Sequence, residues 1–259
     1  MKGLPRRIAG YLGAIAFMLL AWEALAVLVG NPALPGPVPT LIDFARLFPS
    51  QLWPNTMISG ARVLAALAIS LVAVPIGLLV GRSPRLDAVV APVVYLTYPI
   101  PKVVFLPVLL ILLGIGDASK ISLIALILFF QILVTARDAA KSIPPDSVLS
   151  VRSLGAGQWD VYRHVVFPAA LPEIFTALRI SVGTAIAVLF FSETVAGTSG
   201  LGWYILDAWS RLDYLAMYAG IVAMGLLGVV FYEVLELIER RVSRWRAAGH
   251  TTDRFGGVA

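Results

Sequence analysis

The sequence predicts an all-α polytopic membrane protein that crosses the bilayer with six helices. Of its 259 residues, 59% are hydrophobic and only 14% are charged, whereas soluble domains average about 45–50% apolar and about 25% charged residues. The apolar residues also gather into blocks long enough for a helix to cross a hydrocarbon core about 30 Å thick. A soluble, unusually apolar enzyme is therefore a much weaker interpretation.

Six segments have the required length and composition, and we expect each to be a helix because backbone groups in lipid must find their hydrogen-bond partners within the segment. They are Ile8–Val29, Val63–Val80, Leu86–Leu113, Ile121–Ala140, Ile174–Val195 and Leu215–Leu237. The first resembles a cleavable signal peptide, but its apolar run is longer than such a peptide needs, so we expect it to remain. In the second, Gly77 and Gly81 have the spacing of small residues that lets two helices approach closely.

Basic residues indicate the orientation, because Lys and Arg accumulate on the cytoplasmic side of membrane proteins. With the N-terminus inside, the outer segments contain only Arg46, Lys120 and Arg211. The cytoplasmic segments contain Lys2, Arg6, Arg7, Arg82, Arg85, Arg137, Lys141, Arg152, Arg163, Arg240, Arg241, Arg244, Arg246 and Arg254. We therefore expect both termini to be cytoplasmic, and we attribute the net charge of +5 to this asymmetry rather than to nucleic-acid binding.

The third segment is irregular because it contains Pro92, Pro99, Pro101 and Pro107. Each proline removes a helix hydrogen-bond donor and bends the helix. Such irregular backbone is tolerated in a bilayer where neighbouring helices or a watery cavity cover it. Two interpretations stay open: a kinked helix that packs against its neighbours, and a helix that lines a transport pathway.

Two of the charged residues within predicted spans are candidates for a transport pathway. Lys102 is in the third, where a bare charge costs about 2.5–3.5 kcal/mol, so we expect a watery cavity, an anionic solute, snorkelling or a pairing with Glu193 to compensate it. Glu193, near the outer end of the fifth span, either gates a pathway or caps the loop Gly197–Gly202. Pro99, Pro101, Lys102 and Glu193 are thus the candidate pathway residues.

Two outer connections are long and are expected to be loops. The first, Asn31–Thr56, is rich in proline, and the second, Gly197–Asp213, contains the aromatic residues Trp203, Tyr204 and Trp209. Aromatic side chains are enriched at membrane–water interfaces. We therefore expect these aromatics to anchor the chain at the interface rather than to form a docking surface.

Residues 146–167 form a polar island between the fourth and fifth apolar segments. A helix-capping residue, a turn-forming residue and a helix-stopping residue punctuate it in order: Asp146 or Ser147, then Gly155, then Pro168. We expect two short helices, one that ends at about residue 154 and one from 158 to about 166. Such a compact protruding unit suits contact with a soluble partner, although an ordinary membrane-surface hairpin fits the same pattern.

Motifs of catalysis are absent from the sequence. It contains no Gly-x-x-x-x-Gly-Lys-Ser/Thr phosphate loop, no Gly-x-Ser-x-Gly and no His-Glu-x-x-His motif. There is no cysteine, and the two histidines, His164 and His250, are far apart in the sequence. We therefore expect no catalytic residue, no metal site and no cofactor in this chain.

At the polar island the sequence resembles the cytoplasmic loop of binding-protein-dependent ABC importer permeases. That loop reads Glu-Ala-Ala, three residues, glycine, and later a closing Ile-x-Leu-Pro. The segment RSLGA at 152–156 places Gly155 at the glycine, and residues 165–168 occupy the closing element. Leu149, Ser150 and Val151 stand in place of Glu-Ala-Ala, so one capping or partner contact made by the glutamate is lost.

Further segments are similar to the nitrate, sulfonate and taurine group of these permeases. They are LPGPVPT at 34–40, YPIPKVVFLPVLLILLGIGDASKI at 98–121, LPEIFTALRISVG at 171–183 and GLGWYIL at 200–206. The resemblance covers most of the chain and implies a type I ABC importer permease fold in a bacterial inner membrane. It also implies a single transmembrane permease domain over residues 1–259, with 146–167 as its coupling-helix loop and a small anionic solute as its substrate.

The same resemblance implies partners. A second, usually identical permease copy would complete the pathway, and a periplasmic solute-binding protein would deliver the solute. Two cytoplasmic ATP-binding subunits would bind ATP and Mg²⁺ and dock on the loop. The residues implied to couple the permease to the ATPase are Arg152, Ser153, Leu154, Gly155, Ala156, Trp159, Tyr162 and Arg163.

Two other functions compete with this prediction. A self-contained secondary transporter would be indicated by inverted repeats and a pair of broken helices, but the sequence contains one proline-rich span without a counterpart. A membrane-embedded enzyme or assembly factor would require a catalytic constellation, which the sequence does not supply. The importer permease is therefore the main prediction.

Overall fold

A computed structural model describes residues 4–243, and over this range the chain consists of helices and turns without a β-strand. This confirms the all-α prediction. Within residues 4–243, five helical stretches are long and apolar enough to cross a membrane, or six when one bent pair is counted as a single span. Lys2, Arg244, Arg246 and Arg254, on which the predicted orientation partly rests, lie outside the described residues, so the cytoplasmic location of the termini stays a prediction.

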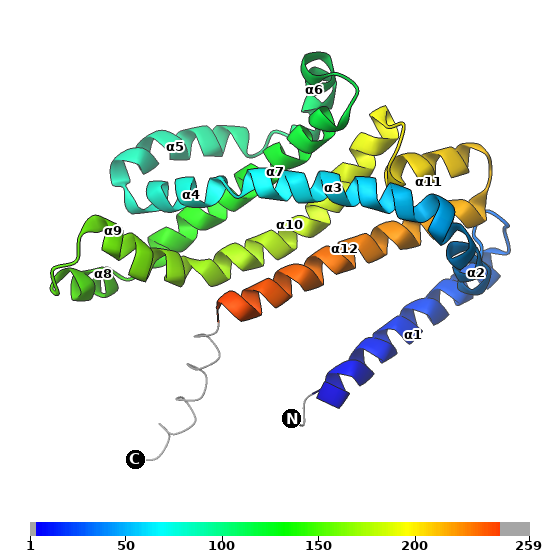
Figure 1. Cartoon of the computed structure of the whole chain (residues 1–259), viewed down its shortest axis with the longest axis horizontal. Helices are drawn as coiled ribbons and strands as arrows, with labels where there is room; N and C mark the ends of the chain where they lie inside the picture. The colour runs from blue at the N-terminus through cyan, green and yellow to red at the C-terminus, as the bar shows by residue number, and fades with distance from the viewer. Residues whose placement is uncertain (1–3, 244–259) are drawn as a thin grey trace. The chain divides into compact units, whose positions relative to one another are not determined.

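The helices follow one another with short connections (Figure 1). In chain order they are α1 (Leu4–Val29), α2 (Pro37–Leu47), the π turn η1 (Phe48–Leu52), α3 (Trp53–Ser70), α4 (Ala73–Arg82), α5 (Pro84–Thr97), the 3₁₀ turn η2 (Lys102–Phe105), α6 (Leu106–Leu113), α7 (Asp117–Ser142), α8 (Pro145–Arg152), α9 (Gln158–Val161), the π turn η3 (Tyr162–Val166), α10 (Phe167–Ala196), α11 (Leu201–Ser210) and α12 (Tyr214–Val242). Two compact units result. The described residues up to Ser59 together with Glu193–Leu226 make unit 1, and Gly60–Ser192 together with the described residues from Leu227 make unit 2.

In unit 2, α4 packs closely against α7 (Figure 1). Gly77 and Gly81 make this approach possible. A Cβ atom on Gly77 would lie 2.6 Å from the carbonyl oxygen of Leu133, and one on Gly81 would lie 2.8 Å from the Cβ of Ala140. The close helix packing expected from small residues at this spacing is thus confirmed.

The predicted third span is broken rather than merely kinked. Helix α5 ends at Thr97, and the segment Lys102–Leu113 leaves it at an angle of 84°. Pro99 and Pro101 lie in the break, where neither can donate the backbone hydrogen bond that would continue the helix. Pro92, by contrast, is accommodated inside α5.

The prediction that Pro168 stops the second short helix of the polar island is wrong, because helix continues from Gln158 to Ala196. The π turn η3 explains this: the amide of Phe167 donates to the carbonyl of Tyr162, five residues back. The wider turn shifts the hydrogen-bond register just where Pro168 lacks a donor. The same arrangement occurs at η1, which comes shortly before Pro54.

In unit 1, both predicted outer loops are largely helical. The range Asn31–Thr56 contains α2, η1 and the start of α3, and Gly197–Asp213 contains α11. Tyr204, predicted to be an interface anchor, is instead 2% exposed and packs against α12 at Gly220. Burial raises the pKa of Tyr204 to about 12, and its hydroxyl has no hydrogen-bond partner within the described part of the chain. Trp209 is exposed, as an interface anchor requires.

Candidate functional site

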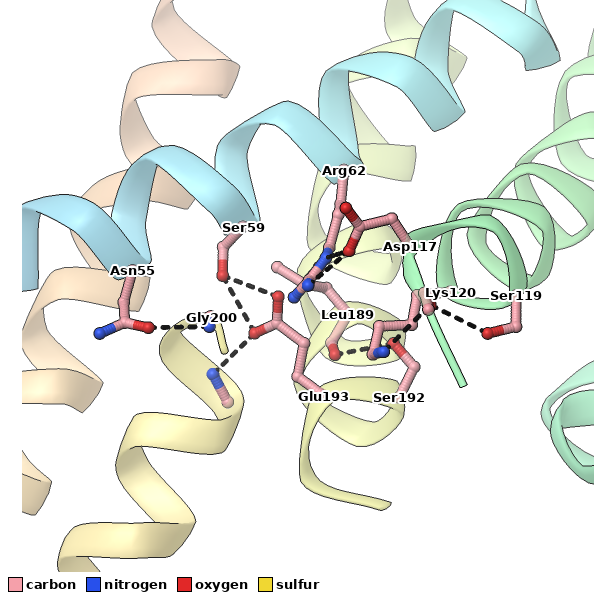
Figure 2. A network of polar contacts seen from close by, with 12 residues as sticks. Asn55, Ser59, Arg62, Asp117, Ser119, Lys120, Leu189, Ser192, Glu193 and Gly200 are labelled. Atoms are coloured by element: carbon pink, nitrogen blue, oxygen red, sulfur yellow. Dashed lines mark hydrogen bonds and ion pairs between the residues drawn. The ribbon is translucent and has the colours of Figure 1, made fainter. Parts of the chain in front are cut away.

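Glu193 is the centre of a buried polar network in unit 1 (Figure 2). Its carboxylate accepts hydrogen bonds from the hydroxyl of Ser59 at 2.8 Å and from the amide of Gly202 at 2.7 Å. The Oγ of Ser59 in turn accepts the amide of Leu201 at 2.8 Å. Glu193 and Ser59 are both completely buried. A carboxylate in this position is stabilised by donors that are already in place.

The network caps the N-terminus of α11, whose first amides cannot find acceptors within the helix. Besides Leu201 and Gly202, the amide of Gly200 is accepted by Asn55 Oδ1 at 2.8 Å. The φ angle of Gly200 is 103°, a conformation that favours glycine. Glu193 also places negative charge at the positive end of the helix dipole. Of the two roles left open for Glu193, the geometry therefore supports capping of the loop before α11.

A second polar cluster lies at the start of α7 in unit 2 (Figure 2). Arg62, from α3, donates to Oδ1 of Asp117 through Nε at 2.9 Å and Nη2 at 2.6 Å. Lys120, which the sequence assigns to an outer segment, is only 2% exposed, and its ammonium donates to the carbonyl of Gly116 at 3.1 Å. Sequence reasoning missed both groups. The available signal was an arginine at the edge of the predicted span Val63–Val80, where a charge requires a partner.

Lys102 closes the break between α5 and η2. Its ammonium donates to the carbonyl oxygens of Thr97, Tyr98 and Ile100 at 3.1, 3.2 and 3.4 Å, and it lies 4.9 Å from the centroid of the Phe130 ring. Carbonyls at the C-terminal end of a helix lack partners within it and carry the negative end of its dipole. The lysine thus compensates the broken backbone through backbone oxygens and an aromatic face rather than through a carboxylate.

Of the candidate pathway residues, three lie together. Pro99, Pro101 and Lys102 lie at the break in unit 2, whereas Glu193 belongs to unit 1. The first three therefore share one local structure, in which the prolines interrupt the helix and the lysine satisfies the carbonyls this exposes. The part of all four in a pathway stays a prediction.

The polar island, residues 146–167, is a helical hairpin in unit 2. Gly155 turns the chain after α8 with a φ of 87°, the left-handed conformation expected of a glycine that ends a helix. The amide of Gly157 then donates to the carboxylate of Asp160 at 3.0 Å, which caps the start of α9. The first short helix and the glycine turn are thus present as the sequence predicts, whereas the second helix continues into α10.

The side-chain cap predicted at Asp146 or Ser147 is wrong. Pro144 is the N-cap residue of α8 and makes no side-chain hydrogen bond, and Pro145 occupies the first helical position. Proline suits that position because the missing donor would have no partner there and its φ already fits a helix. Asp146 lies in the first turn, where its charge still favours the helix dipole.

The hairpin has a buried face and an exposed one. Val148, Val161 and Val166 belong to the core of unit 2, whereas Leu154 and Trp159 are 87% and 75% exposed. Buried valines hold the hairpin to its bundle, while large apolar side chains at an exposed tip are typical of a contact surface. Among the predicted coupling residues, Arg152, Ser153, Leu154, Gly155, Trp159 and Arg163 are exposed, and Ala156 and Tyr162 are half-buried.

Replacing Gly155 by alanine should loosen the hairpin without a steric clash. Its positive φ costs a non-glycine residue about 1–2 kcal/mol, but an added Cβ would meet no atom within 4 Å. We expect faster amide hydrogen exchange across 150–160 and unchanged exchange elsewhere. Gly157→Ala is the matched control, because Gly157 has a φ of −74°. Equal exchange in the two variants would contradict the assignment.

The chain is similar in sequence to a known protein family over most of its length. The family model described as binding-protein-dependent transport system inner membrane component matches residues 73–244. The taurine transport system permease protein TauC of Escherichia coli (strain K12) is 32% identical over 251 residues, which cover 93% of this chain and 91% of TauC. The putative aliphatic sulfonates transport permease protein SsuC of Bacillus subtilis (strain 168) is 29% identical over 237 residues, which cover 89% of this chain and 85% of SsuC.

Solved structures share the fold. An inward-facing form of the MetNI methionine ABC transporter matches with a TM-score of 0.60 and 20% identity, over 74% of this chain and 94% of that one. A chain of an amino acid ABC transporter with histidines matches with a TM-score of 0.58 and 18% identity, over 78% of this chain and 96% of that one. These likenesses confirm the predicted fold.

Proposed function

Since the chain belongs to the family of binding-protein-dependent transport system inner membrane components, we propose that two copies of it form the pathway through which an ABC importer carries a small anionic solute. The chain is the multi-pass inner-membrane permease component of such an importer. The family implies an ATPase and a solute-binding protein as its partners. In our proposal each permease copy binds one ATPase subunit, and a periplasmic binding protein delivers the solute.

A sulfonate-like anion is the solute class that we propose. TauC and SsuC are named for taurine and for aliphatic sulfonates, and both match over most of this chain. In this proposal the binding protein selects the solute and the permease passes it on. The lysine at the break, Lys102, supports an anionic solute only weakly, because its ammonium already has three backbone acceptors.

The polar island, residues 146–167, is the element that we propose docks on the ATPase. The supporting observation is the contrast between its faces: Leu154 and Trp159 are exposed at the tip, and the valines opposite them are buried in the core. The hairpin continues directly into α10 and follows α7 after a short turn. A push on its tip would therefore reach two membrane helices, which suits a bundle with two arrangements.

We propose that this chain holds no ATPase site of its own and that ATP and Mg²⁺ bind to the partner subunit. The sequence lacks the phosphate loop whose backbone amides and lysine hold nucleotide phosphates. Glu193 and Lys102 have structural roles in this proposal, because each satisfies backbone groups at an interrupted helix. In this proposal the chain supplies the pathway and the polar island on which the ATPase docks, and the ATPase supplies the energy.

Replacing Trp159 by glutamate tests the docking proposal. Loss of a central aromatic contact typically costs about 2 kcal/mol or more, so we expect about 30-fold weaker retention of the ATPase and loss of ATP-driven uptake into vesicles. Trp209→Glu is the matched control, since Trp209 is also exposed but lies in unit 1, and it should retain the ATPase. Solute uptake by the permease without any second polypeptide would instead support a secondary transporter.

A further inference from the structure

Two adjoining cavities lie beside the polar island in unit 2. One, of about 420 Å³, is lined mainly by apolar side chains of α4, α9, η3 and α10, together with Arg163, and we call it the apolar cavity. The other, of about 530 Å³, is lined in part by Arg82, Arg85 and Arg152, and we call it the arginine cavity. Leu79 and Tyr162 line both cavities, so an apolar space and a basic space meet at one wall.

Within residues 4–243, no carboxylate is paired with the arginines of the arginine cavity. Among the described residues, Arg82, Arg85 and Arg152 make no side-chain hydrogen bond or ion pair, and no carboxylate lines the cavity. The acidic residue of the neighbouring helix, Asp87, is already held by two basic residues of α7 at 2.5 and 2.6 Å. Neighbouring guanidinium groups without a counter-ion favour an anionic ligand, and their planar geometry suits phosphate.

The cavities lie where apolar spans reach their polar ends. Gly77 approaches Leu133 and Gly81 approaches Ala140, so α4 and α7 run in the same direction and end near one another. The apolar cavity is lined by α4, the last part of an apolar span, and the arginine cavity is lined in part by Arg82 at the end of α4 and Arg85 at the start of α5. An apolar space directly beside a cationic one matches the two parts of an amphipathic ligand.

We propose that an anionic phospholipid of the surrounding bilayer binds here. Its phosphate lies between Arg82 and Arg85, and one acyl chain lies along the apolar cavity. A soluble anion would leave the apolar cavity unfilled, and an acidic protein segment would carry no chain to fill it. Trp159 and Tyr162 also line the apolar cavity, so the bound lipid contacts the polar island and steadies it. This goes beyond the proposed function, because Arg82 and Arg85 are not among the residues proposed to hold the ATPase.

The experiment uses the complete importer complex in vesicles of phosphatidylcholine with a minor fraction of phosphatidylglycerol. Spin-labelled forms of each lipid report how much of it is held immobile by the protein. We expect phosphatidylglycerol to be enriched over phosphatidylcholine. Each arginine near a membrane surface adds about a fivefold preference for anionic lipid, so Arg82→Gln/Arg85→Gln should lower the enrichment at this site about 25-fold. Leu79→Trp, which narrows the apolar cavity, should lower it with both arginines intact.

The matched control is Arg240→Gln/Arg241→Gln, which removes the same charge at the end of α12, where neither side chain lines the two cavities. This control should lower the enrichment much less than Arg82→Gln/Arg85→Gln does. Equal enrichment in the wild type and in the Arg82/Arg85 variant overturns the proposal. So does an Arg82/Arg85 variant that loses the ATPase while keeping its lipid, since the arginines would then serve the protein partner. The lipid test measures phosphatidylglycerol enrichment and the Trp159 test measures retention of the ATPase, so failure of the lipid site and failure of ATPase docking are distinguishable.

Discussion

Replacing Glu193 by alanine should lower the free energy of unfolding by about 3–5 kcal/mol. The change leaves the hydroxyl of Ser59 and the amide of Gly202 without their acceptor. Both groups lie in a fully buried site, where each unsatisfied donor costs about 1–3 kcal/mol. It also removes negative charge from the N-terminus of α11. We therefore expect α11 to detach from the polar residues that hold its first turn.

Heating the purified protein in detergent and measuring the fraction that stays folded checks this expectation. Glu193→Gln keeps one acceptor oxygen and should show an intermediate loss. Glu173→Ala is the matched control, because Glu173 lies on the same helix and is exposed, and surface changes of this kind usually stay within about 0.5 kcal/mol. Midpoints that coincide for Glu193→Ala and Glu173→Ala would show that the network adds no stability.

The membrane helices could be predicted because apolar length is a local property of the sequence. The start of α3 could not. Asn55, Thr56 and Ser59 are polar, so the sequence indicates a loop up to Thr56, yet α3 already begins at Trp53. The reason is tertiary: Asn55 and Ser59 accept the amides of Gly200 and Leu201. Hydrogen bonds between residues more than a hundred positions apart in the sequence cannot be predicted from a local sequence pattern.

The charged residues of the candidate sites could be predicted by type but not by partner. An intramembrane charge must be compensated, and the sequence singles out Lys102 for that reason and Glu193 as a residue that gates a pathway or caps a loop. The groups that compensate these two charges are backbone carbonyls and amides. They are available only where the helical backbone is interrupted or begins, and the sequence pattern does not show those places. Lys102 donates to carbonyls at the break between α5 and η2. Glu193 accepts an amide from the first turn of α11, a helix in a segment that the sequence assigns to a loop.

Proline was the least predictable residue type, because its effect depends on the turn around it. Pro99 and Pro101 end a helix, Pro92 lies inside one, and Pro168 follows a π turn within continuous helix. All of them lack the same donor. A π turn changes which carbonyl would have accepted the hydrogen bond that proline cannot donate. No residue type in the island indicates that such a turn is present. The exposed tip of the island, by contrast, was predictable from its turn-forming Gly155.

Replacing Gly81 by valine should destabilise unit 2 by about 3 kcal/mol or more. A Cβ at this position would overlap the carbonyl oxygen of Arg137 and lie 2.8 Å from the Cβ of Ala140. Backbone cannot move aside as a flexible side chain can, so α4 and α7 must separate. The separation would also disturb the contacts that Arg137 and Lys141, both on α7, make with Asp87. One added side chain therefore weakens both the apolar packing and the ion pairs at this end.

The control for Gly81→Val must separate the clash from the ordinary effect of glycine on a helix. Gly183→Ala serves this purpose, because Gly183 lies in the middle of α10 and an added Cβ would meet no atom within 4 Å. Alanine favours a helix over glycine by about 1 kcal/mol, so this variant should unfold at a higher temperature than the wild type. Opposite shifts in the two variants would assign the role of Gly81 to helix contact. A shift of the same sign in both would mean that backbone flexibility, and not the close approach to α7, is what these glycines provide.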